Sequence, residues 1–184
     1  MSKPVLVAAA WCIFLGTSLM ARATMSVEKA AWPLDDMSVT AIQNTERHQH
    51  MNERGEEGMG FSQATTLHHF LLQASGGTIQ VTVNDSKDTA GRDHIRHHLK
   101  HIANAFAKGD FDIPMFVHDA TPPGVPEMKK MRQTIAYSFE ETPNGGQVVI
   151  RTTNPQALVA IHKFLRYQIE EHQTHDSLQV PSSQ

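Results

Sequence analysis

Hydrophobic and polar residues alternate along two stretches of the chain with the period of a β-strand. In each stretch, residues 65–83 and 135–150, a turn containing two glycines separates two alternating runs. Alternation places one side of a strand on a core and the other side in solvent. Short Gly-containing turns join antiparallel neighbours. The pattern therefore predicts two β-hairpins.

A helical period follows each hairpin. The apolar stripes comprise Ile95, Leu99, Ile102 and Phe106 in the first segment, and Leu158, Ile161, Leu165 and Ile169 in the second. A stripe of this kind is typical of a helix with one buried face. Gly109 is expected to end the first helix, and Asn154-Pro155 supplies a cap residue and an initial proline for the second. The predicted order is strand-strand-helix, twice.

The two units resemble each other in sequence. The pair Gly76-Gly77 and the strand after it return at Gly145-Gly146, and Ile95 and Leu99 return at Ile161 and Leu165. We therefore expect an α+β fold built from an internally duplicated β-β-α unit. A four-stranded antiparallel sheet with both helices on one face would bury every apolar stripe.

Residues 1–23 have the pattern of a secretory signal peptide. Lys3 precedes an apolar run, and Ala21-Arg22-Ala23 forms a cleavage site of the A-x-A type. The alternative, an uncleaved membrane anchor, needs a longer apolar run. The only cysteine, Cys12, lies inside this segment, so export without disulfides favours the periplasm of a bacterial envelope.

The remaining boundaries follow from composition. Residues 44–60 contain no Ile, Leu, Val or aromatic residue, so we expect 24–60 to be a flexible leader. The duplicated domain is predicted at 61–176 and a tail at 177–184. Within the domain, the expected parts are repeat one at 61–110, a connecting loop at 111–132, and repeat two at 133–176.

The charge of the mature chain excludes one class of partner. The whole chain has a formal charge of −3, and cleavage would remove two basic residues, Lys3 and Arg22. A mildly acidic chain without a basic stripe is not a nucleic-acid binder. We expect no stable membrane insertion after the signal is cleaved.

Histidine is the one residue type that points to chemistry. All 12 histidines lie after the signal, and four share one arc of the first predicted helix: His94, His97, His98 and His101. Imidazoles three or four positions apart on a helix can meet one ion, and neutral imidazole binds zinc and copper. We expect His98 and His101 to anchor a metal site, supported by His97. The alternative is a solvated polar helix face.

Two further histidines are candidates to complete that site. His68 and His69 are adjacent on a strand and point to opposite faces, so only one can face the core; we take His69 as the candidate ligand. His118 lies in the Pro- and Met-rich connecting loop. Thioether and imidazole together suit copper, but we expect the methionines to pack in the core and leave His118 open as a ligand.

Sequence patterns of common catalytic sites are missing. The chain has no Gly-x-Ser-x-Gly, no phosphate-binding Gly-rich loop and no His-Glu-x-x-His, and the mature chain has no cysteine nucleophile. We therefore expect a binding protein rather than an enzyme, and we assign no catalytic residues.

Three segments resemble a family of exported bacterial proteins of unknown function. They are Met59-Gly60-Phe61-Ser62-Gln63, the run Thr-Thr-Leu-His-His-Phe at 65–70, and residues 160–176 with the block Phe-Leu-Arg-Tyr-Gln-Ile. The chain departs from the family at His175, where the resemblance implies Gly. Some relatives bear the label aspartate carbamoyltransferase, but this chain has no carbamoyl-phosphate loop of the Ser-Thr-Arg-Thr type. The resemblance implies a location and a domain, and no reaction.

The sequence thus predicts an exported periplasmic protein that binds copper or zinc through histidines. Two alternatives remain open. One is a module that binds a small ligand or a protein partner in a concavity between the repeats, with incidental histidines. The other is a metal-dependent hydrolase.

Overall fold

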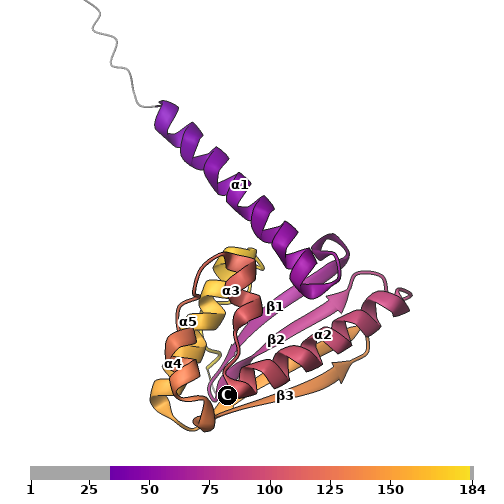
Figure 1. Cartoon of the computed structure of the whole chain (residues 1–184), viewed down its shortest axis with the longest axis vertical. Helices are drawn as coiled ribbons and strands as arrows, with labels where there is room; N and C mark the ends of the chain where they lie inside the picture. Colours follow the sequence, from indigo (N-terminus) through magenta and orange to yellow (C-terminus); the bar gives the residue numbers. More distant parts are fainter. Residues whose placement is uncertain (1–33, 183–184) are drawn as a thin grey trace, which may run out of the picture. The chain divides into compact units, whose positions relative to one another are not determined.

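The structure is a computed structural model that describes residues 34–182. The strands are β1 (Thr66–Gln73), β2 (Gly76–Val83), β3 (Ile135–Thr142) and β4 (Gly145–Thr152), in one antiparallel sheet of order β1-β2-β4-β3. The helices are α1 (Leu34–Met59), α2 (Thr89–Lys108), α3 (Asp112–His118), α4 (Val125–Lys130) and α5 (Pro155–His172), with 3-10 turns η1 (Gln63–Thr65) and η2 (Arg132–Thr134). Figure 1 shows these elements in sequence colours. The predicted α+β class and the four-stranded antiparallel sheet are confirmed.

The two hairpins meet at the centre of the sheet, where β2 pairs with β4. Phe70 of β1 lies opposite Ile79 of β2, Ile79 lies opposite Val148 of β4, and Val148 lies opposite Phe139 of β3. This row crosses all four strands on the face that the helices cover. The inner face of the sheet is therefore continuous between the two repeats.

The helices are exchanged between the repeats. α2, from the first repeat, packs mainly on β3 and β4, whereas α5, from the second, packs on β1 and β2. The Phe106 ring of α2 contacts Tyr137 of β3 with centroids 5.8 Å apart, and the Leu165 side chain of α5 lies against Gly77 of β2. Each repeat thus covers the strands of the other one.

The ends of these two helices follow local chemistry. The Asp88 carboxylate accepts a hydrogen bond from the Gly91 N–H at the start of α2, and Gly109 ends the helix with a φ of 81°. The Asn154 side chain accepts from the N–H groups of Gln156 and Ala157 at the start of α5. The predicted stop at Gly109 and cap at Asn154 are both present.

The segment 24–60, for which we expected a flexible leader, contains the long helix α1. Polar contacts to other helices help to hold α1 in place. Arg47 forms an ion pair with Glu171 of α5, and Arg54 Nε donates to the carbonyl of Val117 in α3. Met51 is buried at 3 % exposure. One buried methionine and long-range polar contacts therefore replace the apolar stripe that the sequence lacks.

The signal peptide predicted at residues 1–23 lies outside the described residues. Among the helices that the structure does describe, none has the length and apolar character needed to cross a membrane.

The connecting loop between the repeats is largely helical, because it holds α3 and α4. Val125 and Met128 of α4 are fully buried, and α4 packs against α5. Gly124 allows this contact, since its φ is 90° and a Cβ there would collide with the Ala160 carbonyl. The loop thus forms a cover over the helical side of the domain.

Candidate functional site

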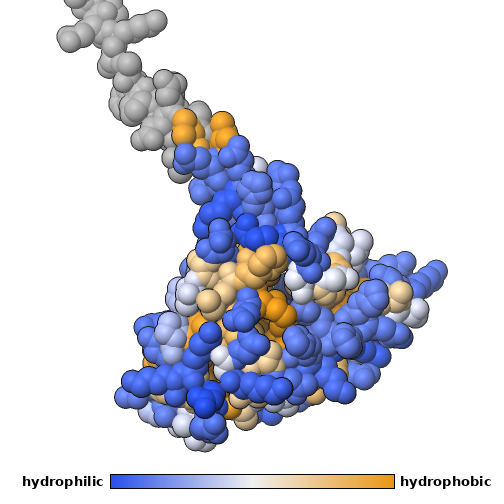
Figure 2. Space-filling model, in the orientation of Figure 1, coloured by the Kyte–Doolittle hydropathy of each residue, from blue (hydrophilic) through white to orange (hydrophobic). Residues whose placement is uncertain are grey.

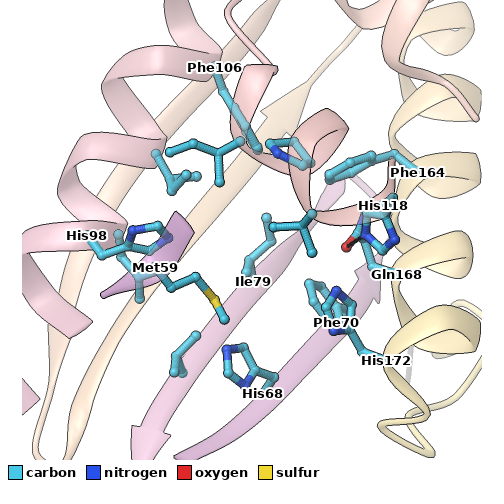
Figure 3. Close-up of a pocket in the computed structure, with 16 residues that line it drawn as sticks. Met59, His68, Phe70, Ile79, His98, Phe106, His118, Phe164, Gln168 and His172 are labelled. Atoms are coloured by element: carbon cyan, nitrogen blue, oxygen red, sulfur yellow. Dashed lines mark hydrogen bonds between the residues drawn. The ribbon is translucent and has the colours of Figure 1, made fainter. Parts of the chain in front are cut away.

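A small cavity lies between the inner face of the sheet and the helices above it. Its volume is about 80 Å³, and most of its lining is apolar. Four histidines from four different elements line it: His68 of β1, His98 of α2, His118 of α3 and His172 of α5. Met59 and Gln168 complete the set of side chains with donor or acceptor atoms (Figure 3). The fold therefore gathers a third of the chain's 12 histidines in one place.

The alternation of β1 places His68 in the cavity. His68 has the same parity as the buried residues Phe70 and Leu72, so its ring faces the helices. The ring stacks near Phe61, with centroids 6.0 Å apart. A polar ring thus occupies a position that the pattern reserves for an apolar side chain.

The helical period of α5 places Gln168 and His172 in the cavity. They follow Phe164 at intervals of four residues, so all three lie along one buried face of the helix. Gln168 is only 4 % exposed, and the His172 ring stacks on Phe70 at 5.5 Å. In the last two turns of α5, the buried face therefore carries two polar side chains in place of apolar ones.

His118 is held in a defined orientation at the end of α3. Its Nε2–H donates to the Gln168 Oε1 over 3.0 Å. With the proton on Nε2, the other nitrogen, Nδ1, has a free lone pair. The His118 ring also meets Tyr167 and His172 edge to face, with centroids 5.0 and 5.1 Å away.

The cavity keeps its imidazoles neutral. Burial lowers the pKa of His68 and of His98 to about 4 and that of His172 to about 3. Burial also lowers the pKa of His118, although the Gln168 hydrogen bond opposes the shift. Each imidazole is additionally disfavoured as a cation by a neighbouring histidine or arginine. At neutral pH the cavity therefore presents uncharged nitrogen donors.

Buried polar atoms without a hydrogen-bond partner within the protein concentrate in this cavity. Of the seven such side-chain atoms among the described residues, four belong to residues that line the cavity: His68 Nε2, His118 Nδ1, Gln168 Nε2 and His172 Nδ1. A buried polar atom left without a partner costs about 1–3 kcal/mol. Such atoms are rare in native proteins, so four around one small cavity make it the candidate functional site.

Two of the sequence-predicted site residues lie in the cavity. His98 points into it from α2, and His118 from α3. His97 and His101 lie outside it, exposed to solvent on the neighbouring side of α2. His69 lies on the opposite face of the sheet, where its Nδ1–H donates to the Asp176 Oδ1 over 2.9 Å.

Asp176 explains the position of His69. Its other carboxylate oxygen accepts from the Phe70 N–H at the free edge of β1. Burial raises the pKa of this carboxyl group, but the hydrogen bonds from Thr174, Phe70 and His69 together outweigh burial and lower the pKa. His69 and Asp176 thus hold the tail against β1, away from the cavity.

A second, wider hollow lies on the outside of α2, with a volume of about 470 Å³. His94, His97 and His101 line it together with Glu57 from the end of α1. In Figure 2 the visible face of the molecule is mainly hydrophilic, and apolar side chains gather where the end of α1 approaches α3. The histidine arc that the sequence singles out therefore faces this hollow, and His98 also lines the inner cavity.

Sequence reasoning missed His68, Gln168 and His172 as site residues. His68 could have been recognised because it lies two residues before Phe70 in the strand, and so on the same face of the sheet. The signal for the other two was their spacing of four residues on the core face of α5. Neither pattern predicts that β1 and α5 lie side by side, because this contact depends on how α5 packs on the sheet.

The side chains do not form a finished metal centre. Within the described residues, no group of three or more His, Cys, Asp or Glu side chains is arranged to hold one ion. Comparison with known proteins adds no further constraint, since no family model, curated protein or solved structure matches this chain.

Proposed function

We propose that the protein binds a single copper ion as Cu(I) in the cavity, through His68, His118 and His172. The observation that carries the proposal is the set of buried imidazole nitrogens without partners in one small space. The three residues come from β1, α3 and α5, so an ion there would link elements of both repeats and the connecting segment.

The protonation state of the three imidazoles suits ligation. Metal binding requires neutral imidazole, and burial lowers the pKa of all three rings and so favours their neutral form. A ligating histidine commonly donates its second ring N–H to a neighbouring oxygen, which fixes its orientation. His118 already does this toward Gln168, which leaves Nδ1 free to bind.

The spacing of the rings is compatible with one ion. Imidazole nitrogens lie about 2.0–2.1 Å from a bound metal, so two rings on one ion have centroids roughly 5–6 Å apart. The centroids of His118 and His172 are 5.1 Å apart, and those of His68 and His172 are 6.3 Å apart. The stacked orientation of His68 on His172 must change, and rotation about the broad χ2 torsions of both rings would aim their nitrogens at one point.

The polarity of the cavity favours a monovalent, soft ion. None of the described residues that line it is Asp or Glu, so neutral ligands would leave the full charge of the ion in an apolar space. The cost of burying an ion rises steeply with its charge, which disfavours Zn²⁺ relative to Cu(I). Met59 adds a thioether, a ligand type that selects Cu(I) (Figure 3).

The volume of the cavity also argues for an ion. Pockets for drug-sized ligands and cofactors have volumes of about 300–1,000 Å³, whereas this cavity has about 80 Å³. Together with the signal peptide expected at residues 1–23, this supports an exported copper-binding protein of the periplasm.

The test is withdrawal of Cu(I) from its coloured bicinchoninate complex under argon. The protein is expected to remove one equivalent, and the variant His172→Phe to remove much less. Phe fits beside Phe70 and removes a ligand without adding a polar atom. The control His50→Phe/His175→Phe changes two histidines that lie outside the cavity and should retain wild-type binding.

A small uncharged ligand is the second candidate, because the rings do not yet surround a common point. Such a ligand would have a hydrogen-bonding edge for His118 and His172 and an apolar body. Failure of the wild-type protein to withdraw Cu(I) or to bind Zn²⁺ by calorimetry would reject the metal and favour this ligand.

A further inference from the structure

The outer hollow and the inner cavity are neighbours that share part of their lining. Met59, His98 and Ile113 belong to both. They come from the end of α1, from α2 and from α3, so three separate elements meet at this boundary. Figure 3 shows the thioether of Met59 and the ring of His98 on the same side of the cavity.

The hollow has its own donor groups for a cation. His97 and His101 are four positions apart on α2, a spacing that allows two imidazoles to bind one ion. His94 lies one further turn toward the start of the helix, and Glu57 brings a carboxylate from α1. All of these side chains are exposed, unlike those of the inner cavity.

We propose that this hollow is a loading site, at which the ion is first captured and from which His98 passes it into the cavity. The inference rests on the proposed copper function and adds the route to it. In the first step, an imidazole pair of the hollow replaces solvent or a delivering ligand on the ion. In the second, His98 and Met59 bind the ion while the outer imidazoles leave.

The arrangement lowers the barrier to burying a charge. An ion that entered the apolar cavity directly would lose its surrounding ligands in one step, and desolvation of an ion is costly. A chain of donors allows the ligands to be exchanged one at a time. His98 is suited to the middle position, because it contacts both spaces and its Phe61 neighbour holds the ring edge to face at 5.6 Å.

The transfer of Cu(I) from bicinchoninate to the protein tests this route, because its end point and its time course answer different questions. The end point reports binding in the cavity, and the rate reports access to it. The test variant is His97→Gln/His101→Gln, and the matched control is His50→Gln/His175→Gln, which removes two exposed histidines elsewhere. Circular dichroism verifies that both variants keep their helices.

We expect the test variant to reach the wild-type end point with a transfer rate at least tenfold lower, while the control changes neither quantity. An unchanged rate at an unchanged end point would overturn the route and leave the cavity site intact. An end point that falls together with the rate would also overturn it, because the hollow would then be the final site. A wild-type chain that takes no copper would reject the proposed function itself.

Discussion

The polar rings in the cavity occupy positions where an apolar side chain would be more stable. His172 stacks on Phe70 and is surrounded by core residues, yet its Nδ1 has no hydrogen-bond partner among residues 34–182. His162, about three turns earlier in α5, differs in this respect. Its Nε2–H donates to the carbonyls of Gln73 and Gly76 and so ties α5 to the first hairpin. One imidazole thus stabilises the fold, whereas the other is suited to a ligand.

Substitution of these two histidines should have opposite effects on stability. We expect His172→Phe to raise the free energy of unfolding by about 1 kcal/mol, because it removes an unpaired buried polar atom and keeps an aromatic ring. His162→Phe should lower it by about 1–3 kcal/mol, since two carbonyl groups lose their donor. Urea unfolding of the metal-free proteins at pH 7.5 measures both. A loss of stability in His172→Phe as large as that in His162→Phe would contradict the assignment.

Gly124 and Gly60 both have a positive φ, of 90° and 75°, but only Gly124 is crowded. A Cβ at Gly124 would collide with the Ala160 carbonyl of α5, whereas a Cβ at Gly60 would meet no atom within 4 Å. The left-handed conformation costs an L-residue roughly 1–2 kcal/mol at either position. We therefore expect Gly60→Ala to lose only that amount and Gly124→Ala to lose clearly more, as measured by urea unfolding. Equal losses would show that α4 adjusts freely on α5.

At the scale of elements, the exchange of helices makes each repeat depend on the other. The strands of the first repeat are covered by α5, and those of the second by α2. A β-β-α unit alone would leave the apolar face of its own hairpin exposed. The central pairing of β2 with β4 would also be missing.

We expect the isolated segments 61–110 and 111–176 to lack cooperative folding when they are prepared separately. When they are mixed, they should regain helical circular dichroism and a single unfolding transition. The comparison of thermal melts for each segment and for the mixture measures this. A segment that melts cooperatively alone would mean that the repeats are independent units.

The elements with strong local patterns are the ones that the sequence predicts. The hairpin turns, the Asn154 cap and the Gly109 stop depend on neighbouring residues alone, so they can be recognised without the fold. α1 could not be recognised in this way, because its contacts are to residues far away in the sequence, such as Glu171. The site has the same limit. The helical arc predicts that His98 and His101 are close, but which of them shares a cavity with His118 depends on how α2 and α3 are placed.

At the scale of the whole molecule, the buried histidines couple stability to pH. The pKa of His68 and of His98 is about 4 and that of His172 about 3 in the folded chain, compared with an ordinary value of 6.5. Between these values the unfolded chain binds more protons than the folded one. Stability is therefore complete above pH 6.5 and decreases as the pH falls toward 4.

We expect the free energy of unfolding to be nearly constant from pH 8 to 7 and to fall steeply between pH 6.5 and 4.5. Each buried imidazole contributes up to about 1.4 kcal/mol per pH unit while it stays neutral in the folded chain. His172→Phe should reduce the slope of unfolding free energy against pH by the contribution of one imidazole. His175→Phe, at an exposed position, should leave this slope unchanged. Urea unfolding of the metal-free chain at half-unit steps of pH measures the slopes. A wild-type slope equal to that of His172→Phe would mean that the His172 ring is protonated without leaving the cavity, and the neutral donor set on which the proposed copper binding depends would then be incomplete.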